Sequence, residues 1–275
     1  MRHNRPISHF FFILRSARIL IFLATAAVIW IGVYSMNRTP DSASETAPEA
    51  TEATPETAPD PAPEDPEKPL NPQPAEPNVI PLGGDRFKIG TVEFDKAKRT
   101  ITIPAAVLMR EGAVEYLLVT RTGKVHESVF VTDADPQDIH LAALLLGIRP
   151  SADLGPADSS MKVPPTAALQ ASVTWDRNGP PQTIHLHEAL AIAPAGETSP
   201  SGPAPATLWL YNGSRLQQDG TFVARREGSI ISVIRDPEAL INYPGDTRDN
   251  DEIHLPNAAA LPKLEHPVRI VLKLR

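Results

Sequence analysis

The sequence of 275 residues contains no cysteine. A chain without thiols forms no disulfide, ligates no iron–sulfur cluster, and has neither a thiolate nucleophile nor a cysteine-based zinc site. Several motifs of known chemistry are absent as well: a glycine-rich phosphate loop, a dinucleotide-binding fingerprint, an H-E-x-x-H zinc helix and a G-x-S-x-G nucleophile elbow. These absences exclude a thiol-based redox role and leave no indication of a common enzyme class.

A basic stripe is also lacking in the larger part of the chain. Residues 79–275 carry 20 basic and 23 acidic residues, so this part is nearly neutral. Proteins that bind nucleic acids usually neutralise phosphates with clustered lysines and arginines. We therefore expect no nucleic-acid partner.

An uncharged apolar run near the N-terminus predicts a transmembrane helix over residues 19–36. Its length is about the minimum for a hydrocarbon core roughly 30 Å thick. Residues 1–36 contain four arginines, all ahead of the run, and no acidic residue. The positive-inside rule then predicts a single-pass protein of the inner (cytoplasmic) membrane with a cytoplasmic N-terminus and a periplasmic or extracellular C-terminal domain. We expect an uncleaved signal anchor; a cleaved signal peptide is the alternative, although no small-x-small site follows the run.

The next segment, residues 37–78, has the composition of a disordered linker. It contains 11 prolines and ten acidic residues and almost no large apolar side chain. Such a segment cannot form a core, and repeated proline favours the polyproline II conformation. We expect a spacer or tether between the membrane and a single folded domain over residues 79–275.

The folded part is expected to belong to the α+β class and to be rich in β-structure, with mostly antiparallel sheets and a few short helices. Asp135-Pro136 has the pattern of a helix start, and the apolar run that follows predicts a short buried helix ending near Gly147. A second short helix is expected from Asp236-Pro237. Alternating or β-branched runs predict hairpins from 87–94 with 99–103, 116–120 with 125–132 and 171–175 with 183–187, and further strands at 207–211, 221–225, 229–234 and 268–274.

Two blocks of this part resemble the YdjY-like domain of bacterial envelope proteins. The first extends from Lys124 through His126-Glu127-Ser128 to Gly147, and the second from Trp209 through Gly213 to Ser229. The resemblance covers roughly residues 85–274 and implies an envelope domain without an established activity. Some relatives are labelled ferredoxin-like, and this chain departs from that label because it has no thiolate for a cluster.

His126, Glu127 and Ser128 are the first candidate site. On a strand, His126 and Ser128 would share one face, whereas Glu127 would point to the other face with three valines. Glu127 therefore could not orient His126 in a local triad, and a buried Glu127 would need a basic partner. A structural role is favoured over catalysis, and His126 is expected on the more solvated face.

His185 and His187 are the second candidate site. Their i, i+2 spacing on a strand would direct both imidazoles to one face, and His126, His140 or His254 could then supply a third metal ligand. Two histidines alone are a weak signal, and a solvated strand face is the favoured interpretation. We predict no cofactor and no confident metal site.

The leading functional hypothesis is a non-enzymatic binding or scaffolding module of the cell envelope, held at the membrane by residues 19–36, with an envelope protein or cell-wall component as its partner. A metal- or small-ligand-binding domain using His126, His185 and His187 is the first alternative. A hydrolase built around His126 and Ser128 is the second.

Overall fold

The computed structural model describes residues 78–275, except for 157–158, 178, 195–196, 198 and 200. The strands are β1 (Val79–Gly83), β2 (Arg86–Ile89), β3 (Val92–Asp95), β4 (Thr100–Val107), β5 (Tyr116–Thr120), β6 (Ser128–Thr132), β7 (Ala168–Arg177), β8 (Gly179–His185), β9 (Leu190–Ile192), β10 (Gly202–Pro203), β11 (Trp209–Tyr211), β12 (Ser229–Ser232), β13 (Ile241–Asn242), β14 (His254–Pro256) and β15 (Pro267–Leu274). The helices are α1 (Pro136–Leu145) and α2 (Val223–Glu227), with short 3-10 turns η1 (Val125–Glu127), η2 (Pro165–Ala167) and η3 (Leu186–Ala189).

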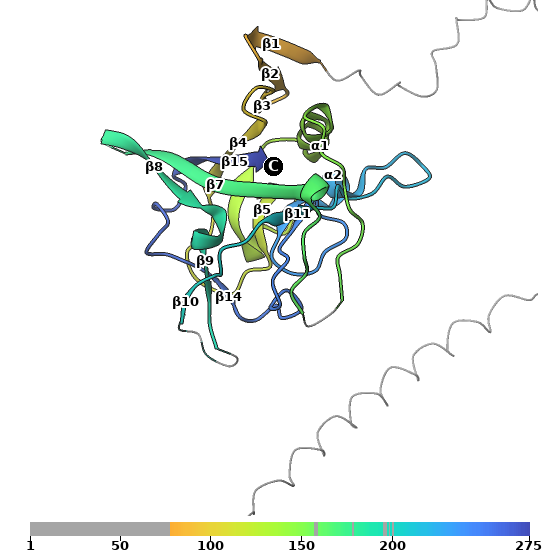
Figure 1. Cartoon of the computed structure of the whole chain (residues 1–275). Helices are drawn as coiled ribbons and strands as arrows, with labels where there is room; N and C mark the ends of the chain where they lie inside the picture. The colour runs from red at the N-terminus through yellow and green to blue at the C-terminus, as the bar shows by residue number, and fades with distance from the viewer. Residues whose placement is uncertain (1–77, 157–158, 178, 195–196, 198, 200) are drawn as a thin grey trace, which may run out of the picture. The chain divides into compact units, whose positions relative to one another are not determined.

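Eight strands close into a mixed β-barrel (Figure 1). Their order is β4-β15-β7-β11-β13-β12-β5-β6, and pairing of β4 with β6 completes the ring. The pairs β12–β13 and β5–β6 are parallel, and the other six are antiparallel. Closure satisfies the backbone groups that an open sheet would leave at its edges. The β-rich domain expected from the sequence is confirmed.

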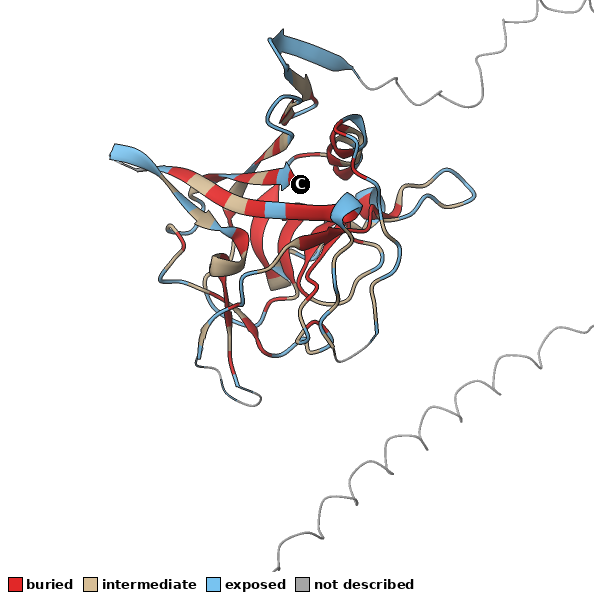
Figure 2. Cartoon of the chain, viewed as in Figure 1, coloured by how far each residue is buried: buried red, intermediate tan, exposed pale blue. Residues whose placement is uncertain are grey.

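Inward-facing apolar residues fill the barrel, as the buried segments in Figure 2 show. Strand β15 has the expected alternation: Val268, Ile270, Leu272 and Leu274 are buried, and most residues between them are exposed. Its central position, paired with β4 on one side and β7 on the other, follows from this pattern.

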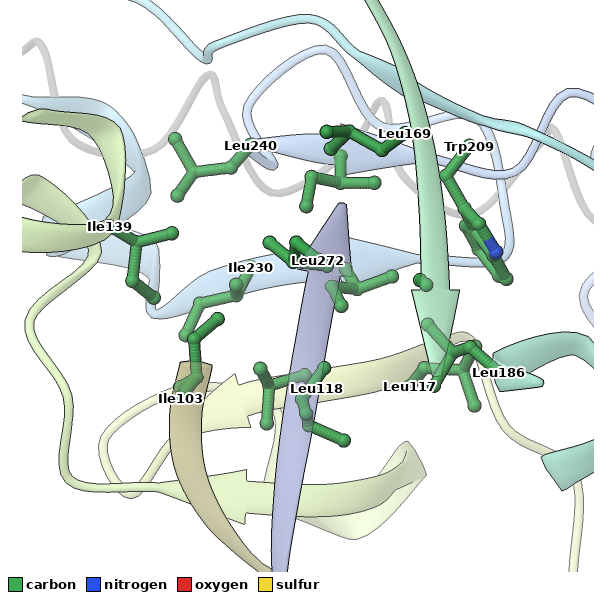
Figure 3. Close-up of a cluster of buried hydrophobic side chains, with 14 of the residues drawn as sticks. Ile103, Leu117, Leu118, Ile139, Leu169, Leu186, Trp209, Ile230, Leu240 and Leu272 are labelled. Atoms are coloured by element: carbon green, nitrogen blue, oxygen red, sulfur yellow. The ribbon is translucent and has the colours of Figure 1, made fainter. Parts of the chain in front are cut away.

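Helix α1 contributes to the same core. It starts as predicted, because the Asp135 carboxylate accepts a hydrogen bond from the Gln137 N–H and Pro136 occupies the first turn. In Figure 3, Ile139 of α1 points toward the cluster of barrel side chains. The helix is less buried than its apolar sequence predicts, since Leu144 and Leu145 are exposed. Ile139, Ala142, Ala143 and Leu146 form the buried face of the helix, so Leu144 and Leu145 lie on its outer face.

The hairpin expected from residues 116–120 and 125–132 is wrong, because β5 and β6 are parallel. Residues 125–127 form η1 instead of strand, and β6 begins at Ser128. The connection over residues 121–127 can span about 23 Å, enough to return along a five-residue strand of about 17 Å. After this return β6 pairs with β4, and that pairing closes the barrel.

Several further secondary-structure predictions are wrong because a single residue or a loop changes the course of the backbone. The run 87–94 is divided by Gly90, whose positive φ makes a turn between β2 and β3. The segment expected as strand 221–225 contains the start of α2. No helix follows Asp236, and the strand expected over 183–187 ends at His185.

Side chains from elsewhere in the fold explain the missing helix after Asp236. The carbonyls of residues 236, 237 and 239 accept hydrogen bonds from the amides of Asn242 and Asn212. The carbonyl of Glu238 accepts from the Ser214 hydroxyl. These carbonyls are therefore not available for helical hydrogen bonds, although Asp236 still bonds the Glu238 N–H as a local cap.

The expected membrane segment at 19–36 lies outside the described residues, as does the expected linker apart from Asn78. Within the described part of the chain, every helix is too short or too polar to cross a bilayer.

Candidate functional site

The residues just before the first family-like block contact the second block at a pair of glycines. A Cβ atom on Gly228 would lie 2.7 Å from the Gly123 Cα and 2.4 Å from the Thr120 Oγ1. The Thr120 N–H also donates to the Gly228 carbonyl at 2.9 Å. Because φ of Gly228 is +73° as well, only glycine fits this close approach.

A cluster of charged and polar side chains around Lys124 lies next to this contact. The Lys124 ammonium donates to the Tyr116 Oη at 3.0 Å, and it lies 3.5 Å from the Glu115 carboxylate and 3.6 Å from that of Glu127. The Tyr116 hydroxyl in turn donates to the Asp236 carboxylate at 3.1 Å. The cluster therefore joins β5, the loop before β6 and the loop after β12, and it borders a pocket of about 190 Å³.

Burial and charge shift the pKa values of this cluster in known directions. Burial, followed by the nearby Glu127 carboxylate, raises the pKa of Glu115. Burial also raises the pKa of Tyr116 to about 12. For Lys124, burial opposes the charged form, but contacts with Tyr116, Glu115 and Glu127 outweigh it and raise the pKa. At neutral pH Lys124 is therefore a charged ammonium and Tyr116 a neutral phenol. These two groups hold the loops together by hydrogen bonding, and neither of them can act as a base.

The structure brings His126 and Glu127 together and separates both from Ser128, which strand periodicity did not predict. The His126 Nε2 lies 4.0 Å from the Glu127 carboxylate, so the expectation that Glu127 points away from His126 is wrong. His126 lies in η1 with 79% of its side chain exposed, and Glu127 pairs with Lys124. Ser128 is fully buried, and its hydroxyl donates to the Lys124 carbonyl at 2.7 Å. His126 and Ser128 therefore do not share a solvated face. All five residues of β6 are buried, so both faces of this barrel strand are covered.

His185 and His187 do lie together, but only His185 belongs to a strand: it ends β8, and His187 lies in the 3-10 turn that follows. Their rings stack with centroids 5.5 Å apart and planes inclined by 12°. The backbone N–H of His185 donates to the Glu188 carboxylate at 2.7 Å, which starts η3. Burial, opposed by Glu188 and aided by His185, lowers the pKa of His187. Among the described residues, no three histidine, aspartate or glutamate side chains gather closely enough to hold a metal ion.

The other two histidines considered as third ligands have their own partners. His140 of α1 is hydrogen-bonded through Nδ1 to the Tyr211 hydroxyl at 2.7 Å. His254 is fully buried, with its Nε2 3.0 Å from the Thr247 Oγ1. Both are tied into packing, and burial lowers the pKa of each.

Sequence reasoning missed a pocket of about 420 Å³ beside the β7–β8 hairpin. Trp175 and Ile184 of the hairpin face Leu261 and Pro262 of the loop before β15. The polar lining residues include Gln182 and Lys263, whose side chains have no hydrogen bond or ion pair among the described residues. The pairing of β7 with β15 brings these segments together, although Trp175 and Leu261 are more than 80 residues apart in the sequence.

Neither the curated proteins nor the solved structures include a match to this chain. Residues 92–273 match the model of the YdjY domain. This range contains the glycine contact, the Lys124 cluster and the Trp175 pocket, and it covers well over half of the sequence. The protein belongs to the YdjY domain family.

Proposed function

We propose that this domain is a non-enzymatic binding module of the cell envelope. In this proposal, residues 19–36 hold it at the cytoplasmic membrane, and the folded part lies on the periplasmic or extracellular side. The observation that carries the binding role is the open pocket beside Trp175. Ligand sites in proteins are usually concave and mostly apolar, with a few polar groups that fix orientation.

The ligand that fits this pocket best is an apolar side chain of a peptide or partner protein. Its walls of tryptophan, isoleucine, leucine and proline favour burial of apolar surface. Gln182 and Lys263 offer unused donors for the carbonyl groups of a peptide backbone.

The sheet next to the pocket also favours an extended peptide. Within the part of the chain that the structure describes, strand β8 pairs only with β7, so its other edge is open there. Pro180 and Pro181 cannot donate hydrogen bonds from that edge, whereas the backbone N–H groups over Gln182–Ile184 that point away from β7 can. A peptide strand added there would place alternate side chains toward the pocket.

The local chemistry supports binding over hydrolysis. The Ser128 hydroxyl is buried and donates to a backbone carbonyl. Glu127 is paired with Lys124, and His126 is exposed on a turn. A nucleophile needs a neighbouring base and access to substrate, and these contacts supply neither.

Saturation-transfer NMR on the whole chain in non-ionic detergent tests the pocket, with N-acetyl-L-phenylalaninamide as the probe and N-acetylglycinamide as the chemical control. We expect transfer to the phenyl protons and none to the glycine compound. Ala260→Phe places a ring in the pocket and should abolish the transfer. Ala258→Phe, two residues away on an exposed position outside the lining, is the matched control and should retain it. Equal transfer in both variants would exclude this pocket as the contact site.

The topology needs its own test. Protease added to intact spheroplasts should cut within residues 37–78 and release the domain. A domain that stays protected until the membrane is dissolved would contradict the proposed orientation.

A further inference from the structure

A second pocket, of about 280 Å³, lies where α1 ends and the β4–β15 pair begins. Figure 1 shows the end of β15 beside α1, and both Gly147 and Arg275 line this pocket. Ile148, Ala168 and Leu274 form a buried apolar floor. The lining residues with side-chain hydrogen-bonding groups are Arg99, Arg275 and Thr166.

Arg99 is the last residue of the turn between β3 and β4, and its backbone has the left-handed conformation that such turns use. Its φ is +53°, in the left-handed region where residues with a Cβ are disfavoured. Among the residues with described positions, Ser214 and Glu265 are the other two non-glycine residues with positive φ, and the Ser214 hydroxyl makes two hydrogen bonds that fix its loop. Arg99 has no side-chain hydrogen bond or ion pair among the described residues.

The polar groups of this pocket are donors without an opposing carboxylate side chain. Arg275 and the Thr166 hydroxyl, like Arg99, have no side-chain partner among the described residues. The nearby carbonyls at the end of α1 do not occupy these donors: those of residues 142–144 accept from the N–H groups of residues 146–148. Two guanidinium forks and a hydroxyl match an anion with several oxygens better than a two-oxygen carboxylate.

We propose that the pocket formed by Arg99, Arg275 and Thr166 binds a phosphate group. The guanidinium groups contact the phosphate oxygens, and the apolar floor accepts whatever the phosphate is attached to. Free inorganic phosphate and a phospholipid headgroup both provide this chemistry. The site is separate from the Trp175 pocket, so the proposal does not depend on the proposed function.

Thermal unfolding of the whole chain in non-ionic detergent, with inorganic phosphate against sodium chloride of equal ionic strength, tests the proposal. At a concentration about tenfold above the dissociation constant, phosphate should raise Tm by about 4 °C. Arg99→Gly should have two separate effects on Tm. Without phosphate Tm should rise, because glycine adopts the positive φ without strain. With phosphate there should be no additional rise, because the guanidinium is gone. Lys98→Gln, next in the chain, removes the same charge outside the pocket and should leave the phosphate effect unchanged.

The same unfolding assay with short-chain phosphatidylglycerol added to the detergent, compared with short-chain phosphatidylcholine, identifies the source of the phosphate. Dependence on Arg99 with inorganic phosphate supports a free phosphate ligand, and dependence on Arg99 with the anionic lipid alone supports a lipid headgroup. Arg99→Gln separates loss of the guanidinium from relief of strain and should lose binding without the gain in Tm. No response in either assay, or equal responses in the parent and both Arg99 variants, would overturn the proposal.

Discussion

Protonation of the buried His254 should govern the stability of this domain in mild acid. The imidazole is fully buried, its Nε2 contacts the Thr247 Oγ1, and its ring lies edge-on to that of Tyr243. Burial disfavours the imidazolium and lowers the pKa of His254 to about 4. The folded domain therefore keeps this ring neutral at pH values at which the unfolded chain protonates it.

The size of the effect follows from the two pKa values. An unfolded histidine has a pKa of about 6.5, so the difference of about 2.5 units corresponds to about 3 kcal/mol of unfolding free energy. Because the folded value is the lower one, this stability is fully present above about pH 6.5 and is lost as the pH falls through about 4. Between pH 7.5 and pH 4.5 the loss from this group should be about 2.5 kcal/mol.

Urea unfolding at these two pH values checks the reasoning. In His254→Gln the amide does not titrate, so the loss between the two pH values should be smaller than in the parent by about 2.5 kcal/mol. The lowered pKa values of His140 and His187 contribute equally to both proteins and cancel. His126→Gln, at an exposed position, should keep the parent's loss. A loss in His254→Gln as large as that in the parent would refute the argument.

Three further predictions concern the contacts around the site, and chemical denaturation measures each. Gly228→Ala should cost more than about 2 kcal/mol because of its close contacts and positive φ, whereas Gly220→Ala, with positive φ but open space, should cost about 1 kcal/mol; equal costs would contradict the close approach. Asn212→Ala should cost about 2–3 kcal/mol, because two carbonyls and one amide lose a buried partner, and a cost below about 0.5 kcal/mol would show that water replaces the amide. Glu127→Ala should cost at most about 1 kcal/mol, since its ion pair with a half-exposed lysine is screened, and His126→Ala should cost almost nothing; a severe loss from the histidine change would invert this assignment.

Several local elements could be derived from the sequence because short-range physics fixes them. Asp135-Pro136 sets the start of α1, and the alternation in the last strand sets the face that β15 buries. The antiparallel β7–β8 pair also follows from two β-forming runs joined by a short turn. In each case the residues that decide the structure are neighbours in the chain.

The candidate sites could not be derived in the same way, because their parts are distant in sequence. Tyr116 and Asp236 form a hydrogen bond across 120 positions, and the Trp175 pocket depends on a loop more than 80 residues further along the chain. Lys124 lies inside the family-like block, yet nothing in that block indicates its partners.

The sequence by itself determined the exclusion of thiol chemistry, the β-rich class, the family resemblance and the buried face of β15. The tertiary structure alone decided that β5 and β6 are parallel, that the sheet closes into a barrel, and that His126 lies on an exposed turn. The physical reason is that ring closure satisfies backbone hydrogen bonds between strands far apart in the chain. That requirement outweighs the local preference for a hairpin and sets which side chains meet.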